Sequence, residues 1–118
     1  MNEKMDALNE KNRIVAILDE HKADDIVSVE VGEFNPFASY VVIATCLNPR
    51  ALGAMKDILA EELEKDQIEI SVSEGEPDSG WVIVATEEVI IHLLLAANRR
   101  ELDLETLLDQ LAHRIGKA

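Results

Sequence analysis

The sequence has few aromatic residues, one cysteine and no long apolar run, and each shortage excludes a class of protein. Aromatic residues make up 3% of the 118 residues and hydrophobic residues 47%, so the core must be aliphatic. The single cysteine, Cys46, cannot form an internal disulfide, which suits a reducing compartment. No apolar run approaches the roughly 20 residues of a membrane span, and residues 1–8 lack the apolar core of a secretory signal. We therefore expect a cytoplasmic protein.

Basic residues are also scarce. The chain has 24 acidic and 11 basic residues, which gives a formal net charge of -13. Such a charge argues against direct binding to nucleic acid, because Lys and Arg are needed to displace the counterions of the phosphate backbone. It favours either solubility alone or docking onto a basic partner, and composition leaves both interpretations open.

The patterns of a catalytic or ligand site are missing from the sequence. The five glycines are not spaced as in a phosphate-binding loop, so no nucleotide cofactor is predicted. The three histidines lie in different predicted elements, and no paired-cysteine motif accompanies Cys46, so no metal site is predicted.

Two residues nevertheless have a reactive and an inert interpretation. Cys46 precedes a predicted helix, where a thiol can become nucleophilic. We favour a small buried hydrophobe, since no histidine lies near it in sequence. His92 stands alone among aliphatic residues, which is typical of a core or interface histidine with one hydrogen-bond partner. The alternative for His92 is a pH-sensitive contact.

Periodicity of 3.6 residues predicts three helices. Residues 2–21 form an amphipathic helix, and a second helix begins at Asn48-Pro49, which supply a cap and a first-turn proline, and runs to about Lys65. A third begins near Asp103. The predicted buried stripes are Met5, Leu8, Val15 and Leu18, widened by Ile14 and Ile17; Leu52, Met55, Leu59 and Leu63; and Leu104, Leu107, Leu108, Leu111 and Ile115.

Five shorter segments predict strands. Residues 25–31 alternate as in a half-exposed strand, residues 40–45 are continuously apolar as in an interior strand, and residues 68–72 alternate as at a sheet edge. Residues 81–85 and 89–95 are close enough to form a hairpin. We expect an α/β (α+β) fold of order αββαβββα, with one mixed sheet of about five strands covered by helices. It forms a single domain, in which residues 1–22 are an N-terminal helix and residues 23–118 the core.

Residues 23–108 resemble the Iojap-like ribosomal silencing factors, because several landmarks occur in that family's order and spacing. They are ADDI (23–26), ASYVVIATCLNPR (38–50), WVIV (81–84), VIIH (89–92), and Arg99 followed by Leu104, Glu105 and Leu107. The resemblance covers roughly three quarters of the chain, and the ordered series carries it, since each segment alone is unspecific.

The sequence also departs from the family pattern at several points. Ser39 replaces an aspartate, Cys46 a glycine, and residues 85–88 (ATEE) an Asp-x-Gly-Asp turn. Residues 101–102 replace a Phe-Tyr pair, and Leu108 replaces a tryptophan. The loss of three aromatic residues alters the surface near the last helix, because aromatic residues often anchor interfaces.

The resemblance implies a nucleotidyltransferase-like fold without catalytic residues, no enzymatic activity and no cofactor. It implies binding to the large ribosomal subunit through a basic ribosomal protein of the L-fourteen family, which blocks joining of the small subunit and represses translation. The candidate contact residues are Trp81, His92, Arg99, Arg100, Glu105 and Tyr40.

Each candidate contact residue also has a structural interpretation. Trp81 could fill core between sheet and helix, and Tyr40 is better explained as core. Arg99 and Arg100 could be solvated loop charges. Glu105 would be favoured in the first turn of a helix by the helix dipole whatever the partner.

Two functions of other classes remain open at this stage. One is a small enzyme of the nucleotidyltransferase type, which would need carboxylates converging in a pocket. The other is an adaptor or homodimer without a ribosomal role, which would pair through an exposed sheet edge or its last helix.

Overall fold

The computed structural model describes residues 6–32 and 38–103 and confirms the predicted fold class and element order. In chain order the elements are α1 (Ala7–Glu20), β1 (Asp24–Glu30), β2 (Tyr40–Cys46), α2 (Pro49–Lys65), β3 (Ile70–Glu74), the 3-10 turn η1 (Pro77–Ser79), β4 (Trp81–Thr86), β5 (Val89–Leu95) and α3 (Ala96–Leu102). None of the helices in these two stretches is long and apolar enough to cross a membrane.

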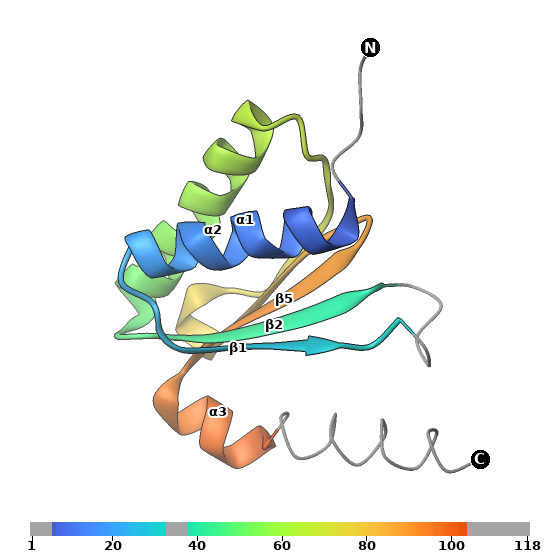
Figure 1. Ribbon diagram of the computed structural model, residues 1–118. Helices are drawn as coiled ribbons and strands as arrows, with labels where there is room; N and C mark the ends of the chain where they lie inside the picture. Colours follow the sequence, from blue (N-terminus) through green and yellow to red (C-terminus); the bar gives the residue numbers. More distant parts are fainter. Residues whose placement is uncertain (1–5, 33–37, 104–118) are drawn as a thin grey trace, which may run out of the picture.

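The five strands form one mixed sheet in the order β1-β2-β5-β4-β3. Strands β2 and β5 are parallel, and the other neighbours are antiparallel, including the predicted β4–β5 hairpin. Figure 1 shows α1 and α2 on one face of the sheet and α3 on the other. We call these the inner face and the outer face. The apolar strand β2 is interior, as predicted, and β3 lies at an edge.

The second helix matches its prediction closely. The side chain of Asn48 accepts a hydrogen bond from the N–H of Ala51 at 2.8 Å, which caps the helix, and Pro49 occupies its first turn. All four residues of its predicted apolar stripe are buried on the inner face of the sheet: Leu52, Met55, Leu59 and Leu63. The capping residue and the apolar stripe therefore predicted both the start of α2 and its buried face.

The buried face of α1 agrees with the predicted one at Ile14, Ile17 and Leu18 and differs from it at Leu8 and Glu10. Leu8 is 50% exposed, whereas Ile14, Ile17 and Leu18 are fully buried against the inner face. Glu10 is buried as well, at 4% exposure. The predicted stripe is thus confirmed in the second half of α1 but not at Leu8, and Met5 lies outside the described residues.

Buried Glu10 is paired with a threonine from the other end of the chain. The hydroxyl of Thr86, the last residue of β4, donates a hydrogen bond to the Glu10 carboxylate. The same oxygen accepts one from the N–H of Val89 at 3.1 Å. Thr86 belongs to residues 85–88, where the sequence departs from the family pattern, and it attaches α1 to the hairpin.

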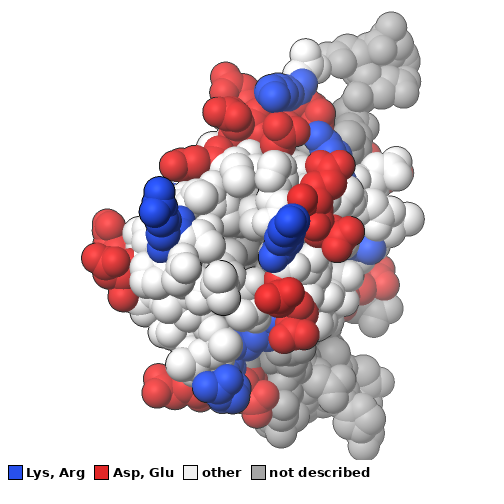
Figure 2. Space-filling model, turned by 90° about the vertical axis from the view of Figure 1, so that its left-hand side faces the viewer, with Lys and Arg blue, Asp and Glu red and all other residues white. Residues whose placement is uncertain are grey.

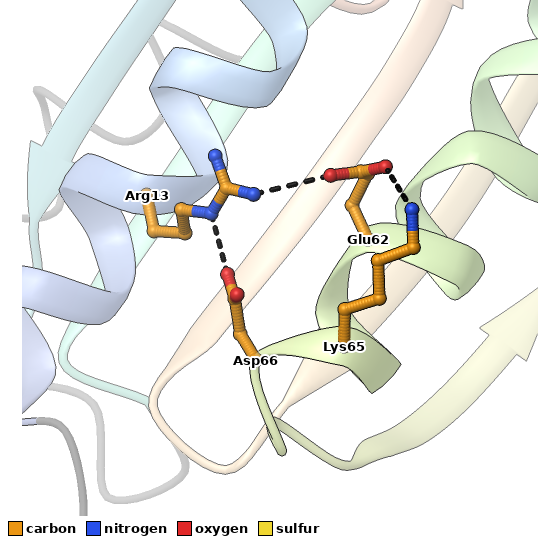
Figure 3. Close-up of polar contacts among 4 residues, drawn as sticks. All are labelled: Arg13, Glu62, Lys65 and Asp66. Atoms are coloured by element: carbon orange, nitrogen blue, oxygen red, sulfur yellow. Dashed lines mark hydrogen bonds and ion pairs between the residues drawn. The ribbon is translucent and has the colours of Figure 1, made fainter.

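A second polar contact joins α1 to the end of α2 (Figure 3). The Arg13 guanidinium donates to Glu62 Oε1 at 3.1 Å and, through Nε, to Asp66, the residue that ends α2. Lys65 bridges the other oxygen of Glu62 at 3.3 Å. The Arg13 side chain is 30% exposed, so solvent screens these pairs only in part.

We expect Arg13→Met to lower the free energy of unfolding by about 1 kcal/mol, because it removes two charge-assisted bonds but keeps the aliphatic stem. Lys65→Met is the control, since the Lys65 side chain is 66% exposed and makes one pair within the same helix. Its expected loss is below about 0.5 kcal/mol. Urea unfolding of both variants measures the difference. Equal losses would show that the contact between α1 and α2 adds nothing specific.

The last described helix does not lie where the sequence placed a helix. Residues 96–102, which include the two arginines interpreted as possible loop charges, form α3. Asp103, near which the final helix was predicted to begin, ends α3 in a left-handed conformation, with φ of 47°. The predicted stripe from Leu104 to Ile115 lies outside the described residues.

Candidate partner-binding site

The outer face of the sheet carries an apolar cluster of its own. Because side chains alternate along a strand, the residues of β2 and β5 that do not face α1 and α2 point to this side. Four of its residues are buried, namely Val31, Val41, Ile43 and Leu94, and three more pack against them in part, namely Val29, Trp81 and Ile90. The cluster gives this face an aliphatic centre around which the candidate contact residues can be placed.

Trp81 and His92 form a pair on this face. Trp81 lies opposite Leu94, and Ile83 lies opposite His92, so the two rings are diagonal neighbours on β4 and β5. The Trp81 indole N–H donates to Nδ1 of His92 at 3.0 Å, and the ring centroids are 5.8 Å apart. Among the described residues, Trp81 is therefore the hydrogen-bond partner of His92. Trp81 does not fill the core under α1 and α2.

The pKa of His92 is lowered from its ordinary value because the imidazole is largely buried. The neutral ring is therefore the form present near neutral pH. A neutral imidazole carries one proton, and since Nδ1 accepts the indole bond, that proton is on Nε2. The pair thus fixes both the charge and the tautomer of His92.

Arg99 reaches the same face from α3. Its Nη1 donates to the hydroxyl of Thr45 at 2.7 Å. Thr45 lies beside Leu94, and Leu94 lies beside Trp81, so the three strand residues form one row across β2, β5 and β4. The structure therefore brings Trp81, His92 and Arg99 onto one surface.

Arg100 lies next to that surface in an open cleft. The cleft runs between the start of β1 and α3 and is lined by Asp25, Ile26, Val27, Thr45, Ala96, Arg99, Arg100 and Asp103. Arg100 itself is exposed. The two arginines are thus helix residues at the end of an apolar surface.

The loop before β4 holds α3 in place. Asn98 of α3 donates to the carbonyl of Ser79 at 3.0 Å, and the N–H of Leu95 donates to the carbonyl of Gly80 at 3.0 Å. Gly80 has φ of 83°, and a Cβ at this position would collide with the Asn98 side chain. Because Trp81 directly follows Gly80, these contacts fix the position of α3 relative to the start of β4.

The other two candidates do not join this surface. Tyr40 points to the inner face, where it packs at the margin of the main core. The ammonium group of Lys11 lies 5.4 Å from the centre of its ring, which fits the interpretation of Tyr40 as a core residue. Glu105 lies outside the described residues.

Cys46 has the inert environment that we favoured from the sequence. It is 5% exposed at the end of β2. Burial, and to a lesser degree the charge of Asp24, raise the pKa of the Cys46 thiol to about 11. The thiol is therefore protonated at neutral pH, which does not suit a nucleophile.

We expect Cys46 in the folded protein to react with an aromatic disulfide reagent at least roughly 100-fold more slowly than in the unfolded chain, because both thiolate fraction and access are reduced. The absorbance of the released thiolate, followed with and without denaturant at about pH 8, measures the ratio. Similar rates in the two states would show that Cys46 is accessible and ionised.

Carboxylates do not gather into a site in the part of the chain that the structure describes. No group of three or more His, Cys, Asp and Glu side chains there could hold a metal ion. Glu88, which follows Glu87 in the turn between β4 and β5, accepts a hydrogen bond from the Ser39 hydroxyl at 2.6 Å. Figure 2 shows acidic side chains, with several basic ones among them, around a largely uncharged area at one end of the molecule. This arrangement suits a charged surface better than a catalytic centre.

Sequence reasoning missed one residue of this surface, Thr45. The alternation along β2 places Thr45 on the same side as Val41 and Ile43, so its direction could have been derived from the sequence. The hydrogen bond from Arg99 to Thr45 could not have been derived in this way. Arg99 lies on α3, which starts without a capping side chain, so the sequence carries no signal for the start of this helix.

Comparison with known proteins gives consistent results. Residues 4–116 match the family described as "Ribosomal silencing factor during starvation", RsfS. The ribosomal silencing factor RsfS of Chromobacterium violaceum is 26% identical over 93 residues, which cover 79% of this chain and 76% of that protein. The RsfS of Haemophilus influenzae is 29% identical over 94 residues, covering 80% and 92%. A crystal structure of a Chromobacterium violaceum protein, 24% identical, shares the fold with a TM-score of 0.84 over 89% of this chain and 88% of that one.

Proposed function

This chain belongs to the RsfS (Iojap-like) family of ribosomal silencing factors, which regulate translation and are not enzymes, and on that premise we propose that it binds the large ribosomal subunit and sterically blocks joining of the small subunit. The observation that carries the proposal is the family match over residues 4–116. The mechanism needs no bond to be made or broken. It needs only a surface that occupies the place of the small subunit. The protein would act in the cytoplasm as a single domain.

The partner in this proposal is a basic ribosomal protein of the L-fourteen family. The net charge of -13 supports it, because an acidic chain is attracted to a basic protein and repelled by the surrounding RNA. Such opposite potentials increase the association rate and orient the encounter. Binding should therefore weaken as salt is added, without requiring any readout of nucleic acid.

The outer face is the surface that we propose for this contact. Trp81 offers a half-buried aromatic group beside an aliphatic centre, a combination that is typical of interface anchors. Arg99 and Arg100 add hydrogen-bond donors at its end, next to Thr45. Tyr40, on the inner face, takes no part in this surface.

Co-sedimentation with purified ribosomal subunits tests the proposal. The protein should pellet with isolated large subunits and stay in the supernatant with small subunits. Added salt should release it, because attraction between opposite charges is screened. The absence of binding to large subunits at low salt would count decisively against this function.

The family assignment favours this function over a nucleotidyltransferase-type enzyme. A homodimer is compatible with it, because the sheet has two edges, β1 and β3. Sedimentation velocity of the free protein would measure the oligomeric state separately from ribosome binding.

A further inference from the structure

We propose that Trp81 and His92 act as one recognition element, in which the indole holds the imidazole so that Nε2–H of His92 donates to an uncharged carbonyl oxygen of the ribosomal partner. This inference rests on the proposed function and deepens it. It assigns His92 the role of a specificity-determining donor and Trp81 that of a positioning residue.

The first step concerns the tautomer. An indole N–H can only donate, so Nδ1 of His92 must offer a lone pair across the 3.0 Å contact. In a free imidazole the proton exchanges between the two nitrogens. Here the contact fixes it on Nε2, and the orientation of the ring is fixed with it.

The second step concerns the position of Nε2. Within the described residues this nitrogen makes no hydrogen bond, since the one bond of His92 is at Nδ1. Yet among the same residues no buried side-chain nitrogen or oxygen lacks a partner. His92 is half-buried, and among the described residues the proton on Nε2 is not used, so we infer that it can serve a partner that docks on this face.

The third step concerns the surroundings. Ile43 and Ile83 flank His92 on the neighbouring strands, and Ile90 and Leu94 lie on the same side along β5. These are aliphatic side chains, so the N–H is an isolated donor in an apolar surface. A partner that covers it without an acceptor leaves a buried unpaired donor, which is unfavourable. A carboxylate acceptor would lose its hydration in the same apolar surroundings, so a neutral carbonyl fits better.

The charged groups near the pair are few on every element that reaches this face. On β3, Glu74 lies beyond Ile83 in the same row. On α3, Arg99 is at Thr45, and Arg100 lines the neighbouring cleft. Helices α1 and α2 pack on the other face. Burial is the cause of the lowered pKa of His92, so the ring is neutral at the pH of the cytoplasm.

Protonation of His92 would break its hydrogen bond with Trp81. A doubly protonated imidazole has no lone pair at Nδ1, so it cannot accept from Trp81, and the positive ring would be desolvated by a docked partner. Binding should therefore be constant above the ordinary histidine pKa and weaken as pH falls through the lowered pKa of His92. This dependence should disappear when residue 92 cannot titrate.

Nitrogen NMR of the imidazole tests the tautomer without any partner. The free protein should show protonated Nε2 and unprotonated Nδ1 for His92. In Trp81→Phe, which keeps a ring but loses the donor, the two nitrogens should move toward the values of exchanging tautomers. A mixture of tautomers in the unmodified protein would overturn the inference.

Co-sedimentation with large subunits tests the donor. His92→Leu should bind roughly 10- to 100-fold more weakly, and His92→Gln, whose amide nitrogen can take the place of Nε2, should recover part of the affinity. Trp81→Phe should be weaker roughly 10-fold. Circular dichroism of each variant checks folding. Equal binding by the unmodified protein and His92→Leu would overturn this inference and leave the proposed function intact. Failure of the unmodified protein to bind would overturn both.

Discussion

Thr86→Val is expected to lower the free energy of unfolding by about 2–4 kcal/mol, a large loss for a substitution of nearly equal volume. The hydroxyl of Thr86 is the described partner of the Glu10 carboxylate, and both residues are 4% exposed. Valine keeps the shape but leaves a buried carboxylate and the N–H of Val89 without their partner. Urea or thermal unfolding followed by circular dichroism measures the loss.

Two further variants separate the hydrogen bond from the packing. Thr86→Ser keeps the hydroxyl and loses a methyl group, so its expected loss is about 1 kcal/mol. Combining Glu10→Leu with Thr86→Val replaces both polar groups by apolar ones and should recover much of the stability. If Thr86→Val and Thr86→Ser lost the same amount, the buried pair would have no role in holding α1 on the hairpin.

Charge reversal of the arginine pair is expected to weaken large-subunit binding at least tenfold, which corresponds to about 1.4 kcal/mol. Arg99→Glu with Arg100→Glu removes the donors at the end of the outer face. The added negative charge would by itself favour a basic partner, so weaker binding would report the loss of these donors. Arg99 also bonds Thr45, so circular dichroism must show that the sheet and α3 remain folded. The binding constant, from co-sedimentation at several salt concentrations, is the readout.

The matched control makes the same change in net charge elsewhere. Arg50 and Lys56 lie on α2, which covers the opposite face of the sheet, and they line a different cleft. Arg50→Glu with Lys56→Glu should therefore bind nearly as well as the unmodified protein. An equal change in binding for both double variants would mean that overall charge, and not the outer face, determines binding. Equal binding by the arginine variant and the unmodified protein would remove the two arginines from the site.

The fold was predictable where sequence signals act locally. The start and the buried face of α2 follow from residues within that helix and its cap, namely Asn48, Pro49 and the four-residue stripe. The continuous apolar run of β2 likewise indicates a strand that is buried on both faces. The burial of Glu10 on α1 was not predictable in this way. A charged residue such as Glu10 is normally placed on the solvent side, and only its tertiary partner Thr86, far along the chain, explains its burial.

The candidate site was predictable as a set of residues but not as an arrangement. The resemblance singled out Trp81, His92 and Arg99, and strand alternation gives their directions. Their assembly depends on strand order and on α3, a short helix without a capping side chain at its start. Long-range contacts of this kind leave no periodic signal in the sequence.

The most direct test of steric exclusion is the rate at which purified subunits join, followed by light scattering. Large subunits incubated first with this protein should join small subunits more slowly, in proportion to the fraction occupied, without added nucleotide or metal beyond what joining itself requires. Pre-incubation with small subunits alone should have a lesser effect at short times. An unchanged joining rate on large subunits that are demonstrably occupied would contradict the account.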